Sequence, residues 1–341
     1  MKALVKFAEG REGMGIRDVD VPIPKDDELL VKVMAAGICG TDIHLMKDEY
    51  ACCPPVILGH EYTGIVEKTG KKVTGFKKGD QIISLTAAVT CGTCHYCRQG
   101  LLMLCNERRS IGSGVNGAMA EYMVIPAELA FKLPDNVSGN DIMAIAEPLA
   151  CVVRAVIEKS YLKAGDVVLV SGPGTIGQFA IMVAKMQGAY VIVSGTPEDE
   201  KRLQMAKEMG ADATATDIDE LKRIVNQVTV DGVDVAYECA GVLGSMNTCI
   251  EMLKKKGNLS QVGLFGKPIP VDMDKILYKE LELTVSYATE RTSWEILLQL
   301  AGQGKLDKVD RLISKRLPLQ EWEKAFDIFL NKEGYKIYLI P

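Results

Sequence analysis

The stretch that decides the fold of the middle of the chain is Val167-Val168-Leu169-Val170-Ser171-Gly172-Pro173-Gly174-Thr175-Ile176-Gly177. Its first four residues form a short continuous apolar run, as expected of a strand that is buried on both faces. A G-x-G-x-x-G pattern follows directly, and apolar residues then recur at helical spacing as far as Ala184. Glycines here permit a tight turn and the close approach of a pyrophosphate to the helix N-terminus. The stretch therefore predicts a dinucleotide-binding strand–turn–helix unit with contacts from Gly172, Gly174, Thr175, Ile176 and Gly177.

The residues that follow continue this alternation of strand and helix. Helical patterns occupy 200–209, 221–228 and 243–253. Strand patterns recur at 190–193, 213–215, 233–237, 259–262 and 281–287. Six strands with connections of this length predict a parallel, doubly wound α/β sheet. In this context a merely structural glycine turn is the weaker interpretation of residues 172–177.

The end of the second strand, Ser194-Gly195-Thr196-Pro197-Glu198-Asp199, bears on the choice of dinucleotide. NAD-specific enzymes usually place an acid at the strand end, where it binds the ribose hydroxyls. Gly195 stands there instead and leaves room for a 2′-phosphate, with Thr196, Lys201 and Arg202 as possible contacts. The acids at 198–200 would repel a phosphate, or one of them could reach the ribose. The choice between NAD and NADP stays open and leans slightly to NADP.

Length and composition limit the class of protein. The chain has 341 residues, enough for two domains at about 150 residues each. It is 48% hydrophobic and 25% charged with a net charge of −5, which is ordinary for a globular protein and disfavours a nucleic-acid binder. We see neither a signal peptide nor an apolar run long enough for a membrane span, and therefore expect a cytoplasmic protein.

The two ends of the chain differ from its middle. Strand patterns in the first 145 residues or so, such as 29–34 and 63–67, are separated by turns rich in glycine and lysine. The end of the chain carries helical patterns and a closing strand at 337–340. We expect residues 1–146 with 288–341 to form one mostly β domain, and residues 147–287 to form the dinucleotide-binding domain.

Cys91, Cys94, Cys97 and Cys105 form a C-x2-C-x2-C-x7-C cluster. Four thiolates at this spacing can close a tetrahedral shell around zinc and leave no position for water, so the site would be structural. Two disulfides and an iron or iron–sulfur centre are the alternatives, and the first fits poorly in a reducing compartment. His95 lies between two of the ligands and is interpreted as an exposed bystander.

Two further motifs are Gly37-Ile38-Cys39-Gly40-Thr41-Asp42-Ile43-His44 and Gly59-His60-Glu61-Tyr62. Either one alone could reflect a buried cysteine and a hydrogen-bonded core histidine. Together with the four-cysteine cluster and the glycine pattern, they resemble the zinc-containing medium-chain dehydrogenases, which include alcohol, sorbitol and threonine dehydrogenases. The resemblance runs over the whole chain and implies a GroES-like β catalytic domain joined to a Rossmann domain.

The resemblance also implies a second, catalytic zinc site. Cys39 and His60 match two of its ligands, and a thiolate and a neutral imidazole suit Zn²⁺. Glu147 matches the third ligand of the sorbitol dehydrogenase branch, whereas other branches use a cysteine in this region, for which Cys151 is the candidate. Glu61 matches the residue that lies beside the metal and holds or replaces its water.

Further roles are implied for residues around that zinc and beside the nicotinamide. Asp42 matches a carboxylate that orients His60, and a turn-capping role is compatible with this. Thr41 and His44 match a proton relay, although His44 could be a partly exposed loop residue. The remaining matches, which could also be ordinary strand ends, are Gly241 and Gly263 on the nicotinamide side.

The predicted function is hydride transfer between a secondary alcohol and NAD or NADP, with two zinc ions per chain. The expected substrate is a sugar alcohol, a diol or a 3-hydroxy amino acid, and the expected assembly is a homodimer or homotetramer joined along 281–287. The alternatives are a zinc-independent enone or quinone reductase, which should lack Cys39, His60 and the four cysteines, and a zinc-stabilised binding module for nucleic acid or protein. Arg291 could meet a phosphate or a carboxylate, or it could lie on the surface, which is the favoured interpretation. Cys52 and Cys53 receive no role.

Overall fold

A computed structural model describes all 341 residues, and the chain divides into two compact units. Unit 1 consists of 1–148 and 289–341, and unit 2 consists of 149–288. Both ends of the chain therefore belong to unit 1, with unit 2 inserted between them. Helix α3 (Ala146–Val153) runs across the division. No helix of the structure combines the length and the apolar character that crossing a bilayer requires.

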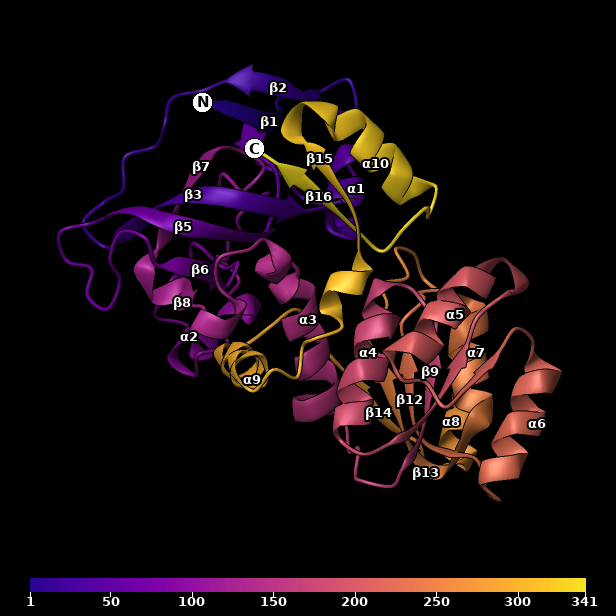
Figure 1. Cartoon of the computed structure of the whole chain (residues 1–341). Helices are drawn as coiled ribbons and strands as arrows, with labels where there is room; N and C mark the ends of the chain where they lie inside the picture. Colours follow the sequence, from indigo (N-terminus) through magenta and orange to yellow (C-terminus); the bar gives the residue numbers. More distant parts are fainter. The chain divides into compact units, whose positions relative to one another are not determined.

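Unit 2 is built on the six-stranded parallel sheet that the sequence predicts (Figure 1). Its strand order is β11-β10-β9-β12-β13-β14, so the first strand of the unit, β9, lies in the middle of the sheet. The carboxyl ends of β9 and β12 meet beside each other, where ligands bind in open α/β sheets. The bounds are β9 Val167–Ser171, β10 Tyr190–Ser194, β11 Ala213–Ala215, β12 Val233–Glu238, β13 Leu253–Gln261 and β14 Glu282–Val285.

The helices of unit 2 begin and end at residues whose chemistry explains the boundary. The Asp217 carboxylate accepts hydrogen bonds from the backbone of Asp219 and Glu220 and so caps the start of α6. Gly210 ends α5 in the left-handed region at φ 116°. A π-helical segment that the sequence analysis did not anticipate follows α3 at Arg154–Lys159. The helices are α4 Thr175–Met186, α5 Glu200–Met209, α6 Ile218–Val228, α7 Leu243–Met252 and α8 Met273–Tyr278.

Unit 1 is mostly β structure. A sheet in the order β15-β16-β3-β5-β6-β8, with β7 also paired to β3, accompanies a small sheet in the order β2-β1-β4. Strand β16 lies directly beside β3, so the yellow end of the chain is next to indigo strands in Figure 1. The bounds are β1 Lys2–Lys6, β2 Met14–Asp18, β3 Glu28–Gly37, β4 Val56–Ile57, β5 Glu61–Thr69, β6 Gln81–Ser84, β7 Tyr122–Pro126, β8 Ala130–Lys132, β15 Ile313–Pro318 and β16 Lys336–Ile340.

Short helices connect the strands of unit 1, and two longer ones come from the end of the chain. Trp294 of α9 is buried and stacks on Phe131 at 5.7 Å between ring centroids. Strand β15, which the sequence analysis missed, is parallel to β16, and α10 contributes Phe326 to the core. The helices are α1 Gly40–Met46, α2 His95–Arg98, α9 Arg291–Gly302 and α10 Trp322–Leu330.

Candidate active site and metal centres

The pairing of β3 with β5 brings the two predicted metal-binding motifs together. Gly37, the last residue of β3, is the register partner of Glu61, the first residue of β5. Cys39 follows β3 by two residues and caps helix α1, and His60 immediately precedes β5. Gly37 has to be a glycine, because a Cβ at this position would lie 2.5 Å from a carboxylate oxygen of Glu61.

Cys39, His60 and Glu61 form a cluster in which one ligand atom of each lies within 4.8 Å of the others. The Glu61 side chain is fully buried, whereas Cys39 and His60 are partly exposed. Burial alone lowers the pKa of His60, but the Cys39 thiolate beside it outweighs this effect and holds the pKa well above its ordinary value. The site therefore gathers negative charge around an imidazole, an arrangement that a dication would also stabilise.

Asp42 lies behind this cluster and is fully buried. One carboxylate oxygen accepts a hydrogen bond of 2.8 Å from the Cys39 backbone N–H. The other lies 3.8 Å from Nδ1 of His60 and has no hydrogen-bond partner. Desolvation raises the pKa of this carboxyl group, and the neighbouring His60 opposes the rise. The structure thus places the Asp42 carboxylate beside Nδ1 of His60.

Lys336, the first residue of β16, completes the site and was not found in the sequence analysis. Its Nζ lies 2.5 Å from both carboxylate oxygens of Glu61 and donates to the Ile38 carbonyl at 3.2 Å. Both side chains of the ion pair are almost fully buried. Desolvation lowers the pKa of Lys336, but Glu61 and Cys39 outweigh it and raise the pKa. The signal available in the sequence was that Lys336 directly precedes the apolar run of the last strand, where a buried lysine would need an acidic partner.

Glu147 lies on α3 and is 9% exposed. Its charge reaches the cluster, since it contributes to the raised pKa values of His60 and Lys336. Its carboxylate is not one of the three groups that lie within 4.8 Å of one another. Cys151, the alternative third ligand, lies on the part of α3 that belongs to unit 2 and is half-buried.

The two predicted relay residues lie on α1. The Thr41 hydroxyl is 3.8 Å from the Cys39 sulfur. His44, one turn further on, is 39% exposed and its Nδ1 lies 2.7 Å from a carboxylate oxygen of Glu49. Glu49 was not singled out from the sequence, although its separation of five residues from His44 is short. His44 is therefore a solvent-facing imidazole with an acidic partner.

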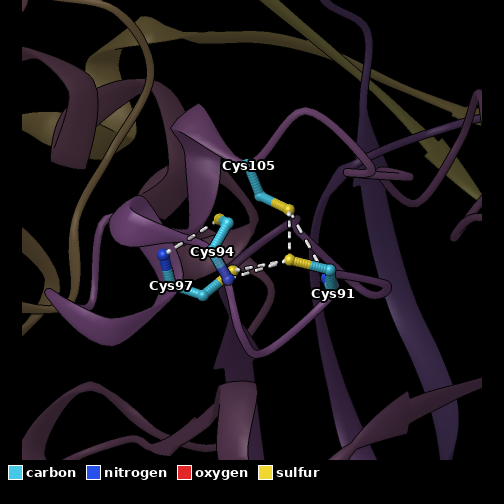
Figure 2. A group of neighbouring side chains, drawn as sticks. All are labelled: Cys91, Cys94, Cys97 and Cys105. Carbon is cyan, nitrogen blue, oxygen red and sulfur yellow. Dashed lines mark hydrogen bonds between the residues drawn. The ribbon is translucent and has the colours of Figure 1, made fainter.

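The four cysteines of the loop 91–105 converge, as Figure 2 shows. The sulfur of Cys91 lies 3.9 Å from that of Cys97 and 3.7 Å from that of Cys105. A tetrahedral shell with metal–sulfur bonds of about 2.3 Å requires sulfur–sulfur distances of roughly 3.8 Å. The donor set and its spacing therefore fit a zinc ion. The His95 side chain is exposed, and its Nε2 is hydrogen-bonded to the side chain of Gln99.

Backbone N–H groups already favour thiolate at part of this cluster. The N–H groups of Cys94 and Cys97 approach the sulfurs of Cys91 and Cys94 at 3.3 and 3.4 Å. Hydrogen bonds from Thr93 and Cys94 lower the pKa of Cys91 to about 6. Desolvation and the neighbouring thiols raise the pKa of Cys97 to about 11. Without a cation the four sulfurs cannot all be charged together, which is the reason a dication fits them.

The glycine loop of unit 2 has the geometry that a phosphate-binding turn needs. Gly172 adopts φ +104°, which side-chain-bearing residues rarely do. A Cβ on Gly177 would lie 2.0 Å from the Gly172 carbonyl oxygen, so the third glycine permits close packing of helix on strand. Gly174 caps α4, and Thr175 and Ile176 are its first two residues.

A cavity of about 220 Å³ lies in unit 2 at the carboxyl ends of its strands. Gly172, Gly195, Thr196 and Asp199 are among the residues that line it. Arg202 approaches the same loop, since one guanidinium nitrogen lies 4.0 Å from where a Gly174 Cβ would be. Of the residues predicted for the phosphates and the adenosine ribose, Gly172, Gly195 and Thr196 line this cavity. The others, Gly174, Thr175, Ile176, Gly177 and Arg202, are not among its lining residues.

The residues predicted for the nicotinamide side are held by a buried acid, Glu238 at the end of β12. One of its oxygens accepts hydrogen bonds from the Ala240 and Gly241 backbone N–H groups at 3.0 and 2.9 Å. A Cβ on Gly263 would lie 2.5 Å from the other oxygen. The sequence analysis did not single out Glu238, and its position directly after an apolar strand was the available signal.

Arg291 lies on the surface of unit 1, where its guanidinium donates to the Glu128 carbonyl and covers the Phe131 ring. The structure therefore supports the surface alternative for this residue. Cys52 is half-buried and Cys53 exposed, and neither belongs to a cluster of metal ligands.

Comparison with known proteins agrees with this geometry. Residues 25–135 match the family model of the alcohol dehydrogenase GroES-like domain, and residues 175–303 match that of the zinc-binding dehydrogenases. The chain is similar to D-arabitol-phosphate dehydrogenase of Enterococcus avium (38% identity, 99% of this chain and 97% of the relative) and to sorbitol dehydrogenase of Halalkalibacterium halodurans (37%, 100% and 99%). A similar solved structure is a zinc-binding dehydrogenase of Sinorhizobium meliloti bound to NADP (33% identity, TM-score 0.89, 100% and 99% covered).

Proposed function

The chain belongs to the zinc-containing medium-chain dehydrogenases, and we propose that it oxidises a secondary hydroxyl of a sugar alcohol or of its phosphate ester. It is an NAD(P)-dependent oxidoreductase, as its relatives are dehydrogenases over their full lengths. The observation that carries the proposal is the cluster of thiol, imidazole and carboxylate at the paired ends of β3 and β5. This is the donor set of an open zinc site rather than of a closed one.

We assign Cys39, His60 and Glu147 to the catalytic zinc. Glu61 lies closer to the thiol and imidazole, but both its oxygens are 2.5 Å from the Lys336 ammonium. Because that ion pair competes with coordination, we assign Glu147 as the ligand in the substrate-free enzyme. Glu61 is then a second carboxylate that could coordinate the zinc when it leaves Lys336. Zinc bound there would act as a Lewis acid that polarises the alcohol oxygen and eases loss of its proton.

The protein's own residues then orient the site and move the proton. Asp42, whose carboxylate lies 3.8 Å from Nδ1 of His60, would help to orient the His60 ring toward the metal. The Thr41 hydroxyl, beside the Cys39 sulfur, would relay the proton by accepting the one from the substrate hydroxyl while donating its own toward His44. The His44 imidazole, which faces solvent and has Glu49 as its partner, would accept that proton and release it to water. The glycine turn of unit 2 would hold the pyrophosphate of NAD or NADP, and the bound dinucleotide would supply the hydride acceptor.

The substrate class rests on the relatives and on the chemistry of the site. A branch with a carboxylate as third ligand is the one to which sorbitol dehydrogenase belongs, and the two similar enzymes act on a sugar alcohol and on a sugar-alcohol phosphate by name. Arg291 is engaged with Glu128 and Phe131 and is not assigned to the substrate. Polyols therefore rank before diols and 3-hydroxy amino acids. The free thiols and thiol ligands suit a reducing compartment such as the cytoplasm.

We further propose that two copies pair along β14. This strand is the edge of the unit 2 sheet, and Leu283 and Val285 on it are 51% and 61% exposed. Tyr278 and Tyr287 extend the apolar surface. An exposed apolar edge strand is a template for pairing with another strand. Leu283→Lys is expected to halve the mass measured by light scattering, whereas Val230→Lys, at an exposed loop position, leaves it unchanged; an unaltered mass in Leu283→Lys rules out this interface.

The test of function combines metal analysis with turnover. Purified protein is expected to contain two zinc ions per chain and to reduce NAD⁺ or NADP⁺ with alditols or alditol phosphates, monitored by nicotinamide absorbance. Simple primary alcohols serve as the control substrates and should react far more slowly. Zinc-loaded protein that turns over none of these polyols with either dinucleotide contradicts the proposed activity.

A further inference from the structure

The carboxylate of Asp199 folds back onto the end of β10. Its Oδ2 accepts a hydrogen bond of 3.0 Å from the Thr196 backbone N–H and one of 2.9 Å from the Thr196 hydroxyl. In return, the Asp199 N–H donates to the Thr196 carbonyl at 2.9 Å. The segment from Thr196 to Asp199 is thus a closed capping box with a charged group at its centre.

Gly195 makes this arrangement possible. A Cβ at residue 195 would lie 3.1 Å from the Asp199 Cβ, 3.2 Å from a Pro173 carbon and 3.3 Å from Asp199 Oδ2. The contact with Oδ2 is tighter than a side chain normally makes. The strand end therefore carries no side chain of its own, and the space beside it is filled by an acid from four residues further along the chain.

Asp199 and Thr196 both line the cavity of about 220 Å³ in unit 2, together with Gly172 of the glycine turn. Within this fold the adenosine ribose lies at the end of the second strand of the sheet, which is β10 here. Glu198 and Glu200 are not among the lining residues. Of the three consecutive acids at 198–200, Asp199 is the one that faces the cavity.

We propose that Asp199 reads the 2′ position of the adenosine ribose and discriminates against a 2′-phosphate. This inference rests on the dinucleotide-dependent function proposed above and assigns the selectivity of its cofactor site. Thr196 offers a 2′-phosphate two donors at this strand end, its backbone N–H and its hydroxyl, and Asp199 already occupies both. Arg202, which approaches the glycine turn, is a cationic group that could still attract such a phosphate. A phosphate must displace this carboxylate and remain close to its charge, whereas a 2′-hydroxyl can donate to it.

Thr196 and the acids that follow it have distinct roles at the strand end, which the sequence alone did not separate. Thr196 was a candidate contact for a phosphate, and the acids beside it were a reason against one. In the structure Thr196 and Asp199 are hydrogen-bonded to each other, so the Asp199 carboxylate occupies donors that a phosphate could otherwise use. The selectivity of the chain is then set by a competition between carboxylate and phosphate for one pair of donors.

The test measures the effect of the 2′-phosphate by itself. Adenosine 2′,5′-bisphosphate and adenosine 5′-monophosphate are titrated calorimetrically into the wild type, Asp199→Asn and Glu198→Gln. Asn can accept the same hydrogen bonds from Thr196, so the turn persists while the charge is removed. Glu198→Gln makes the same change of charge one residue away, outside the cavity lining.

In Asp199→Asn the affinity for the bisphosphate relative to the monophosphate is expected to rise by about tenfold or more, as removal of a like charge at close range implies. The ratio of kcat/KM for NADP⁺ over NAD⁺ should rise in the same variant, and Glu198→Gln should change neither ratio by more than about twofold. An unchanged ratio in Asp199→Asn, or an equal rise in both variants, overturns the inference and leaves the dehydrogenase function intact. Failure of the wild type to bind either nucleotide overturns the cofactor site and the inference with it.

Discussion

The two candidate metal centres of unit 1 are built in opposite ways. The four cysteines come from a loop between residues 91 and 105, and each supplies the same kind of ligand atom. The other cluster draws a thiol, an imidazole and one carboxylate from the ends of β3 and β5, and its buried acid is paired with a lysine 275 residues away in the chain. In our proposal, the first would close a shell around an ion, while the second would leave a position for a substrate.

The two centres differ in what determines the positions of their ligands. A closed site needs only short spacings, because the metal itself orders the loop that supplies the ligands. In an open site the surrounding fold has to fix the positions of the ligands, because otherwise they would move into the coordination position that the substrate needs. Variants at the two centres should therefore fail in different ways, and the following three predictions test that contrast.

The largest effect is expected when the closed site is broken. Cys97→Ser should lose one of two zinc ions and lower the Tm by on the order of 10 °C or more, because the loop 91–105 has little core of its own. Metal analysis and thermal unfolding followed by circular dichroism measure both quantities. Arg98→Ser, at an exposed neighbouring position, is the control. A Tm equal to that of the wild type would mean that the four sulfurs contribute no structural metal site.

The open site should show the reverse pattern. Cys39→Ala is expected to lower kcat/KM for the polyol by at least about 1000-fold while the Tm changes by only a few degrees, because β3, β5 and their neighbours remain paired. Glu147→Ala should behave alike. Steady-state kinetics and the same unfolding assay give the comparison. If Cys39→Ala and Cys97→Ser lose stability equally, the division into an open and a closed centre is wrong.

Substitution of Lys336 is expected to have a smaller effect, which changes both the stability of the protein and its affinity for zinc. Lys336→Met leaves the Glu61 carboxylate buried without its cation, which should lower the free energy of unfolding by about 3–5 kcal/mol. With Glu61 freed to coordinate, the affinity for the catalytic zinc should rise rather than fall, as measured by competition with a chelator. Lys336→Arg keeps the charge and is the matched control. A loss of zinc affinity in Lys336→Met would show that Lys336 supports coordination instead of competing with it.

Much of unit 2 could be predicted from the sequence because its signals are local. The apolar run at 167–170 and the glycines after it fix a strand and a helix within a few residues, and five further strand patterns follow at regular intervals. The closed four-cysteine cluster is local in the same sense. Strand bounds were less accurate: β13 begins at Leu253 rather than at 259, and β14 is shorter than the predicted 281–287.

The parts that could not be predicted depend on contacts between distant segments or on exact side-chain direction. Lys336 meets Glu61 only because β16 pairs with β3, and no spacing in the sequence encodes that pairing. Strand β15 is half-exposed and lacks a clear alternation, so it gave no strand signal. The sequence does not distinguish the three consecutive acids at 198–200 from one another. In the structure only Asp199 closes the capping box and lines the cavity.

The position of Lys336 has a consequence for the order in which a newly made chain matures. A ribosome releases all four cysteines of the loop 91–105 almost together, so that centre can capture an ion early in translation. The buried Glu61 must wait for a lysine 275 residues later, a delay of roughly tens of seconds at ordinary elongation rates. During that interval Glu61 cannot be buried together with its partner, and unit 1 cannot reach its final form until the C-terminal strand emerges.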